Sequence, residues 1–166
     1  METIQKNKIL FAFVNLLLII SCTETTEFNQ YKTIEKASWE ANKKINFEFV
    51  VTDTIYPKNV FINLRNNNDY RFSNLYVITE LNFPNGTIVV DTLQYKMTDN
   101  SGKFLGSGVG DIKDNKLFYK TNKVFPTQGK YNFSIRHAMR KNGEIKPIPF
   151  LEGVSDIGLS IEKIKN

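Results

Sequence analysis

Cys22, the only cysteine in the chain, is the residue whose position points most directly to a chemical reaction. It follows Ser21 and an apolar run over residues 9–20, and two lysines precede that run. A basic segment before about 7–15 apolar residues is typical of an export signal and is short for a membrane-spanning helix. The Ser21-Cys22 junction resembles the bacterial lipobox, in which the cysteine sulfur receives a diacylglycerol. The sequence therefore predicts a lipoprotein signal peptide over residues 1–21 and a membrane anchor at Cys22; the alternative is an uncleaved signal or single-pass anchor.

Residue sets for nucleophilic or metal-dependent catalysis are scarce. His137 is the only histidine, so a metal site with two or three histidine ligands cannot form, and we expect its side chain to be at the surface or half-buried. The glycine-rich run over residues 106–110 has Leu105 where a G-x-S-x-G nucleophile elbow needs its first glycine, which favours a glycine-rich hairpin. We expect no catalytic residue, no metal site, no cofactor and no enzymatic activity.

Carboxylates leave one catalytic alternative open. Two facing carboxylates can hydrolyse a glycoside without histidine or metal. The sequence marks no particular pair among Glu80, Asp99, Asp111 and Asp114. Asp111, Asp114 and Asn115 also miss the spacing of a calcium-binding loop, so solvated turn residues are the favoured interpretation.

A strongly polar segment lies between two apolar stretches and is the candidate interaction loop. Its amides, carboxylate, aromatic ring and guanidinium groups supply donors and acceptors for a glycan or a protein surface. The alternative is a long polar turn in which Asn and Asp bond to their own backbone. The segment consists of Arg65, Asn66, Asn67, Asn68, Asp69, Tyr70 and Arg71.

Two threonines are candidate sites of O-glycosylation. Thr54 and Thr92 each lie between an aspartate and an aliphatic residue. This tripeptide resembles the pattern at which some Bacteroidetes attach O-glycans to exported proteins. We hold modification at both threonines as a hypothesis that an intact mass would test.

Composition and charge limit the remaining function classes. Removal of residues 1–21 takes away two lysines and one glutamate, so the formal charge falls from +5 to +4. The basic residues are dispersed, which argues against nucleic acid and favours weak affinity for anionic envelope components. Residues 22–33 are polar and predict a short lipidated tether. Residues 34–166 are long enough for one domain with a core.

Alternation of apolar and polar residues dominates that domain and predicts strands. The Asn85-Gly86 pair predicts a hairpin turn, because both residues tolerate a positive φ. Only residues 34–42 and 137–141 show short helical patterns. We therefore expect an all-β fold, a single antiparallel β-sandwich of jelly-roll type with seven or eight strands. The predicted strands cover residues 45–51, 60–64, 75–83, 88–97, 117–119, 130–136 and 156–162.

Several sequence blocks, taken in order, resemble the GldH family of gliding motility lipoproteins from the Bacteroidetes. These blocks are residues 61–70, 72–76, 83–86, 91–93, 102–108, 110–112, 129–131 and 154–159, together with the lipobox at Cys22. The resemblance implies a lipid-anchored envelope protein needed for gliding, with other gliding or type IX secretion proteins as partners. It implies no catalytic residues, and only Cys22 carries over as a functional site.

Three functions follow from these patterns, and the first is the one we favour. It is a non-catalytic component of the motility machinery, held at the membrane by a lipid. The second is a glycan-binding β-sandwich lipoprotein of the outer membrane, with Trp39, Tyr70 and Tyr76 as stacking platforms. The third is the carboxylate-based hydrolase. Thr23 after Cys22 departs from the enteric signal for inner-membrane retention, so we expect the outer membrane.

Overall fold

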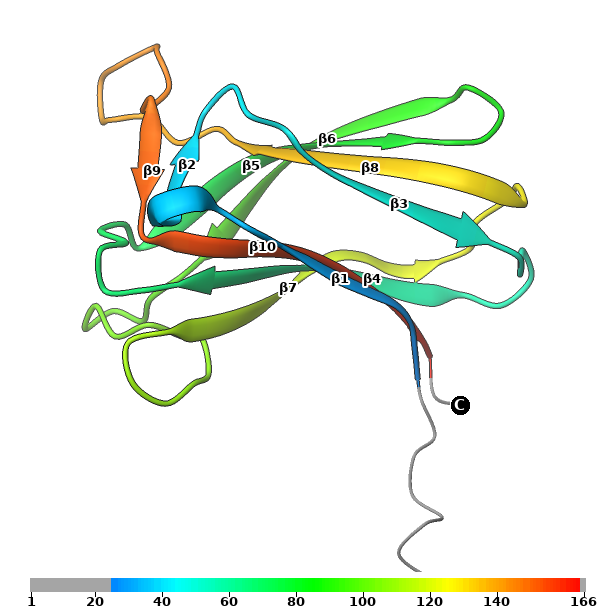
Figure 1. The fold of residues 1–166 in the computed structure, drawn as a ribbon, viewed down its shortest axis with the longest axis horizontal. Coiled ribbons are helices and arrows are strands. Elements are labelled where there is room, and N and C mark those ends of the chain that lie inside the picture. The colour runs from blue at the N-terminus through cyan, green and yellow to red at the C-terminus, as the bar shows by residue number, and fades with distance from the viewer. Residues whose placement is uncertain (1–24, 165–166) are drawn as a thin grey trace, which may run out of the picture.

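The computed structural model describes residues 25–164, and Cys22 with the predicted signal peptide lies outside that range. Strands make up nearly all of its regular structure (Figure 1). The elements are β1 (Thr26–Thr33), the 3-10 turn η1 (Glu35–Ala37), β2 (Ser38–Glu40), β3 (Ile45–Val51), β4 (Lys58–Asn66), β5 (Asn74–Asn82), β6 (Ile88–Lys96), β7 (Lys113–Lys123), β8 (Gly129–His137), β9 (Phe150–Glu152) and β10 (Val154–Lys163).

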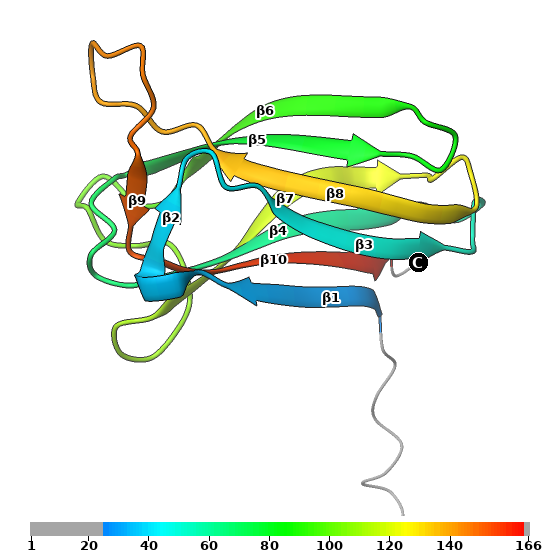
Figure 2. The ribbon, with the colours of Figure 1, turned by 45° about the horizontal axis from the view of Figure 1, so that its top comes forward.

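Two four-stranded antiparallel sheets face each other, with strand orders β1-β10-β4-β7 and β3-β8-β5-β6. The short pair β2-β9 closes one end (Figure 2). The first strand pairs with the last, the second with the ninth, and so on inward to the β5–β6 hairpin. A long hairpin rolled up in this way is the jelly-roll topology. The predicted all-β, jelly-roll-like sandwich is thus confirmed, although residues 25–164 form ten strands and not the seven or eight expected.

Alternation places one face of each long strand in the core. β3 alternates strictly between buried and exposed residues, and β5 alternates between buried and half-buried ones. In β4 the inward residues are Val60, Ile62 and Leu64, which leaves Phe61, Asn63 and Arg65 on the outer face. Aromatic rings fill the space between the sheets, with Phe49, Tyr131 and Phe125 within 5.2–5.7 Å of one another.

The predicted Asn85-Gly86 turn joins β5 to β6. Gly86 has a φ of +84° and its N–H donates to the Phe83 carbonyl at 3.0 Å. Phe83 N–H in turn donates to the Thr87 carbonyl at 2.8 Å, which closes the hairpin. The turn therefore fixes the register of the β5–β6 ladder.

Other expectations need correction. Residues 26–33 are strand β1 of the sandwich, so the predicted tether cannot extend over them. The helical pattern over residues 34–42 corresponds to η1 and β2, and residues 137–141 contain no helix. Trp39 and His137 are both fully buried, with their rings 5.4 Å apart, so His137 is neither at the surface nor half-buried.

Within residues 25–164, no helix has the length and apolar composition needed to cross a bilayer.

Candidate interaction surface

The outer face of the β1-β10-β4-β7 sheet carries three ordered rows of side chains. Neighbouring strands place directly opposed residues side by side, so the rows follow from the register of the sheet. In order across the four strands, the rows are Thr33, Asp156, Arg65, Asp114; Tyr31, Gly158, Asn63, Lys116; and Asn29, Ser160, Phe61, Phe118. We call this set the outer face.

Arg65 is the central cation of the outer face. Its Nε donates to Asp114 Oδ1 at 2.6 Å, and its guanidinium carbon lies 4.4 Å from the centre of the Tyr31 ring. This hydrogen bond to Asp114 raises the pKa of Arg65, so the guanidinium stays charged. Partial burial raises the pKa of Tyr31, so its hydroxyl stays protonated at neutral pH.

Lys116 and two phenylalanines form the second feature of this surface. The Phe61 and Phe118 rings lie 4.7 Å apart, and Lys116 Nζ lies 4.2 Å from the Phe61 ring centre. Lys116 also pairs with Glu162 at 2.7 Å. Phe61 is buried beneath these neighbours, whereas Phe118 is 59% exposed. An exposed ring on an otherwise polar sheet face is available to a partner.

Gly158 allows Tyr31 to lie close to the sheet. A Cβ at position 158 would lie 2.9 Å from a Tyr31 ring carbon and 3.0 Å from the Gln30 carbonyl oxygen. Any larger residue would therefore displace the ring. Beside it, Asn63 Nδ2 donates to Ser160 Oγ at 3.0 Å, which fixes the amide.

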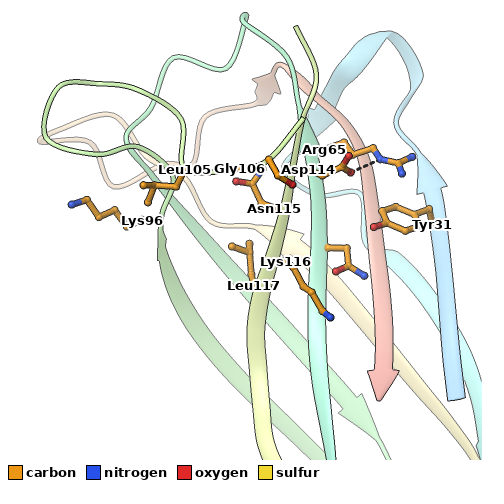
Figure 3. A pocket seen from close by; sticks show the side chains of 11 residues that line it. Tyr31, Arg65, Lys96, Leu105, Gly106, Asp114, Asn115, Lys116 and Leu117 are labelled. Carbon is orange, nitrogen blue, oxygen red and sulfur yellow. Dashed lines mark hydrogen bonds and ion pairs between the residues drawn. The ribbon is translucent and has the colours of Figure 1, made fainter. Parts of the chain in front are cut away.

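A hollow of about 480 Å³ lies over the first half of β7, next to the outer face. Figure 3 shows the Arg65–Asp114 pair and Tyr31 on one side of β7 and Lys96 on the other, with Leu105 and Gly106 above. Gly106 lets its loop pack on β7, because a Cβ there would lie 2.8 Å from Asn115 Oδ1.

The predicted interaction loop divides into residues with different surroundings. Arg65 belongs to the outer face, whereas Asn66 and Tyr70 are buried. Asn115 Nδ2 donates to Asn66 Oδ1 at 2.8 Å, and the Tyr70 hydroxyl donates to a backbone carbonyl at 2.7 Å.

The tip of this loop is held by hydrogen bonds within the turn and to the β6–β7 loop. The Asp69 N–H donates to Asn67 Oδ1 at 2.9 Å, and Asn68 Nδ2 donates to Asp111 Oδ1 at 2.9 Å. Asn68, Asp69 and Arg71 are exposed. The exposed side chains that the loop offers a partner are therefore these three, whereas Asn67 and Arg65 are half-buried.

The two candidate glycosylation sites differ in exposure. Thr92 points to solvent from β6, and Thr54 is half-buried in the β3–β4 loop. The aspartate before each threonine holds a lysine: Asp91 pairs with Lys120 at 3.0 Å and Asp53 pairs with Lys58 at 2.8 Å. Thr92 is therefore the more accessible of the two.

The carboxylates considered for hydrolysis are scattered and engaged in other contacts. Glu80 pairs with Lys44 at 2.7 Å, and Asp114 pairs with Arg65. Asp99 accepts hydrogen bonds from Ser101 and from the Lys103 N–H, which lower its pKa. Among residues 25–164, no group of three or more His, Cys, Asp or Glu side chains is placed to hold a metal ion.

The aromatic platforms expected for a glycan are mostly in the core. Trp39 and Tyr70 are buried, and Tyr76 is half-buried on the opposite sheet. On the outer face, the aromatic residues that a partner can reach are Tyr31 and Phe118, which the sequence did not single out. Their signal was weak, because β1 and β7 carry polar residues on both faces.

Comparison with known proteins places these observations in a family. The family model described as GldH lipoprotein matches residues 26–161. The chain is 45% identical to "Gliding motility lipoprotein GldH homolog" of Christiangramia forsetii over 94% of this chain and 96% of that protein. It is 39% identical to "Gliding motility lipoprotein GldH" of Flavobacterium johnsoniae over 89% and 91% of the two chains.

Among solved structures, the chain is similar to the VP2 subviral particle of infectious bursal disease virus, with a TM-score of 0.34 and 12% identity. The structural match covers 85% of this chain and 39% of the viral chain. The family match and the two relatives span nearly the whole described chain, whereas the viral chain is more than twice as long as the matched part. The chain therefore belongs to the GldH lipoprotein family.

Proposed function

We propose that this protein is a non-catalytic, lipid-anchored component of the gliding motility machinery, linked to type IX secretion, and that it docks on other envelope proteins of that machinery. The family and its gliding motility relatives support the motility role. The outer face carries the docking role, because it presents fixed charges and an exposed ring beside a hollow of about 480 Å³.

Docking suits this surface better than catalysis for a chemical reason. Asp114 lines the hollow and is held by Arg65, and Glu162 is held by Lys116, so both carboxylates are ion-paired and make poor general bases. The Arg65 fork still has its two terminal nitrogens to offer an acceptor on a partner. Charged pairs at the rim of a docking surface select the partner and set the association rate.

Substitution of Arg65 by Glu tests the docking role. Arg65→Glu places a carboxylate beside Asp114 and Tyr31, and we expect it to reduce gliding speed and the recovery of envelope partners by crosslinking. Lys130→Glu is the matched control, because Lys130 forms a similar exposed pair with Glu48 at 2.6 Å on the other sheet. Normal gliding, adhesin display and crosslinking in the Arg65→Glu strain would remove the outer face as the docking surface.

A glycan is the alternative occupant of the same surface. Tyr31 and Phe118 supply rings, and Arg65 supplies donors beside the Tyr31 ring. Glycan arrays with the purified protein test this alternative. Binding that is lost in Arg65→Glu would favour the glycan-binding lipoprotein over the protein-docking role.

Cys22 is proposed as the anchor and the outer membrane as its destination. We expect Cys22→Ala to abolish incorporation of labelled palmitate and to release the protein from the membrane fraction, with loss of gliding. Ser21→Ala keeps the thiol and a small residue before it, and it should be lipidated and motile. A fully motile Cys22→Ala strain would show that the anchor is dispensable. Fractionation of the two membranes tests the destination.

A further inference from the structure

One end of the sandwich, which we call the anchor end, lies next to the start of the described chain. β1 begins and β10 finishes there, and the loops β3–β4, β5–β6 and β7–β8 lie at the same end (Figure 1). The β2-β9 pair closes the opposite end (Figure 2). A strand of nine residues spans roughly 30 Å, so the two ends are well separated.

The length of chain outside the structure limits how far the anchor end can lie from the lipid. Thr25 is the third residue after Cys22. An extended chain covers at most about 3.6 Å per residue, so this segment spans at most about 11 Å. With Cys22 acylated, as proposed above, the anchor end lies close to the bilayer surface and the β2-β9 end is free to lie far from it.

The β3–β4 loop exposes apolar side chains at the anchor end. Ile55 is 76% exposed and the adjacent Tyr56 is 67% exposed. Pro57 follows them and is also exposed. Two large side chains and a proline at one tip form the kind of surface that enters a membrane interface, where tyrosine is enriched.

Hydrogen bonds hold this tip in one conformation. Asp53 Oδ1 accepts from the Ile55 N–H at 2.9 Å and from the Tyr56 N–H at 3.3 Å. Lys58 Nζ donates to Asp53 Oδ2 at 2.8 Å, and this bond lowers the pKa of Asp53 to about 2. The turn therefore persists at neutral pH and presents Ile55 and Tyr56 together.

The charges beneath the tip cancel. The carboxylates of Glu27 and Asp53 face the ammonium groups of Lys58 and Lys163, so the formal charge of this cluster is zero. Lys58 is buried and lies 3.5 Å from Glu27. Anionic lipid headgroups consequently meet no net negative charge at this place.

A second hollow, of about 510 Å³, lies directly behind the tip. Tyr56 and Pro57 line it together with Glu27 and Lys163. The tip is thus adjacent to the start of β1, which is the part of the domain closest to Cys22 in sequence.

We propose that the β3–β4 tip, Ile55 to Pro57, inserts into the lipid surface that anchors the chain. The insertion orients the sandwich with its β2-β9 end away from the membrane. This inference rests on the proposed acylation of Cys22. It adds a second, non-covalent membrane contact made by the folded domain.

Fluorescence quenching in vesicles tests the insertion. Full-length lipidated protein is reconstituted into phosphatidylethanolamine–phosphatidylglycerol vesicles with or without brominated acyl chains. Tyr56→Trp places a probe at the tip, and Val109→Trp is the matched control in the exposed β6–β7 loop at the opposite end. The native Trp39 is fully buried near β9 and gives the same background in both.

We expect brominated lipid to quench the added tryptophan of Tyr56→Trp at least twofold, with a blue-shifted emission, and to leave that of Val109→Trp unchanged. Absence of quenching at position 56, or equal quenching at both positions, would overturn the proposed insertion. If the tip binds a protein partner and not lipid, position 56 will stay unquenched, because these vesicles contain no other protein.

Flotation of the same vesicles separates this inference from the anchoring proposal. If the protein floats with the lipid and position 56 is not quenched, the anchor is intact and the insertion is wrong. If the lipidated protein without substitutions does not float, the anchoring proposal is wrong. An Ile55→Asp/Tyr56→Asp variant should still float through its lipid, and its residues at the tip should become accessible to protease.

Discussion

His137 lies in the core between Trp39 and the strands of the β3-β8-β5-β6 sheet. Among the described residues, neither ring nitrogen has a hydrogen-bond partner. Burial lowers the pKa of His137 to about 4, well below its ordinary value. The folded protein therefore favours the neutral ring, and this residue contributes to stability rather than to proton transfer.

Stability should consequently fall as the pH falls through the range in which His137 is charged only in the unfolded chain. His137 takes up a proton below about pH 6.5 in the unfolded chain, but only near pH 4 in the folded protein. Its contribution to the free energy of unfolding is therefore fully present above pH 6.5 and is lost as the pH falls toward 4. Between pH 7.5 and pH 5 we expect a loss of about 2 kcal/mol. Urea unfolding at both pH values measures it.

His137→Phe is the control for this prediction, because it keeps a ring of similar size and removes the titrating group. Its free energy of unfolding should be nearly the same at pH 7.5 and pH 5. An equal pH dependence in the two proteins would show that another group is responsible, although the chain has no other histidine.

Gly158→Ala should disturb the outer face through a single methyl group. The added Cβ would meet the Tyr31 ring and the Gln30 carbonyl, and we expect a loss of about 1–3 kcal/mol in unfolding free energy. In a Tyr31→Ala background, which lacks the ring, Gly158→Ala should reduce the free energy of unfolding by less. A double-mutant cycle should therefore show coupling between the two positions. Additive effects would mean that the methyl group is accommodated elsewhere.

At the scale of elements, β6 is an edge strand without the usual protection. It pairs with β5 over nine residues without a bulge, whereas the register of the edge strands β1 and β7 shifts. Hydrogen-bonded and non-hydrogen-bonded pairs alternate along the β5–β6 ladder, and the bonds Phe83–Thr87 and Met97–Ser73 show which pairs are bonded. Backbone N–H and C=O groups therefore point away from β5 at Ile88, Val90, Thr92 and Gln94. Ile88 and Val90 are each 59% exposed.

Val90→Lys should therefore slow aggregation of the heated protein without changing its free energy of unfolding. An unprotected apolar edge templates pairing with another chain, and a lysine on it opposes that pairing. Light scattering during heating and urea unfolding measure the two properties. Thr121→Lys on the edge strand β7 is the matched control and should leave aggregation unchanged. Faster or equal aggregation in Val90→Lys would contradict the role of this edge.

Among the elements, the strands with one fully buried face are the ones that the sequence predicts. β3 and β5 were predictable because one face of each enters the core and the other does not. β1 was not, because it lies at an edge and only Phe28 and Tyr31 are half-buried in it. β2 and β9 have three residues each, and they form a pair across more than a hundred residues of sequence.

At the scale of the whole molecule, the anchor end and the β2-β9 end should differ in tolerance to insertion. Residues 141–147 are exposed and lie between β8 and β9 at the end away from the anchor. We expect an epitope inserted between Asn142 and Gly143 to change the free energy of unfolding by less than about 0.5 kcal/mol.

The matched insertion, between Asn85 and Gly86, should be damaging, because that turn sets the register of β5 and β6. Circular dichroism with urea unfolding compares the two proteins. Equal stability of both insertions would mean that the turn does not control the register. The tolerated tag also allows antibody labelling of intact cells to report which side of the membrane the domain faces.

By itself, the sequence predicted the export signal and the cysteine for the anchor, and it correctly indicated the long strands, because each depends on residues that are neighbours in the chain. The sequence also indicated the family, through blocks spread over most of its length. Only the tertiary structure decided the outer face, since Tyr31, Arg65, Asp114 and Gly158 come from four strands whose register local patterns do not encode. The same holds for His137 and Trp39, whose burial depends on how the two sheets close.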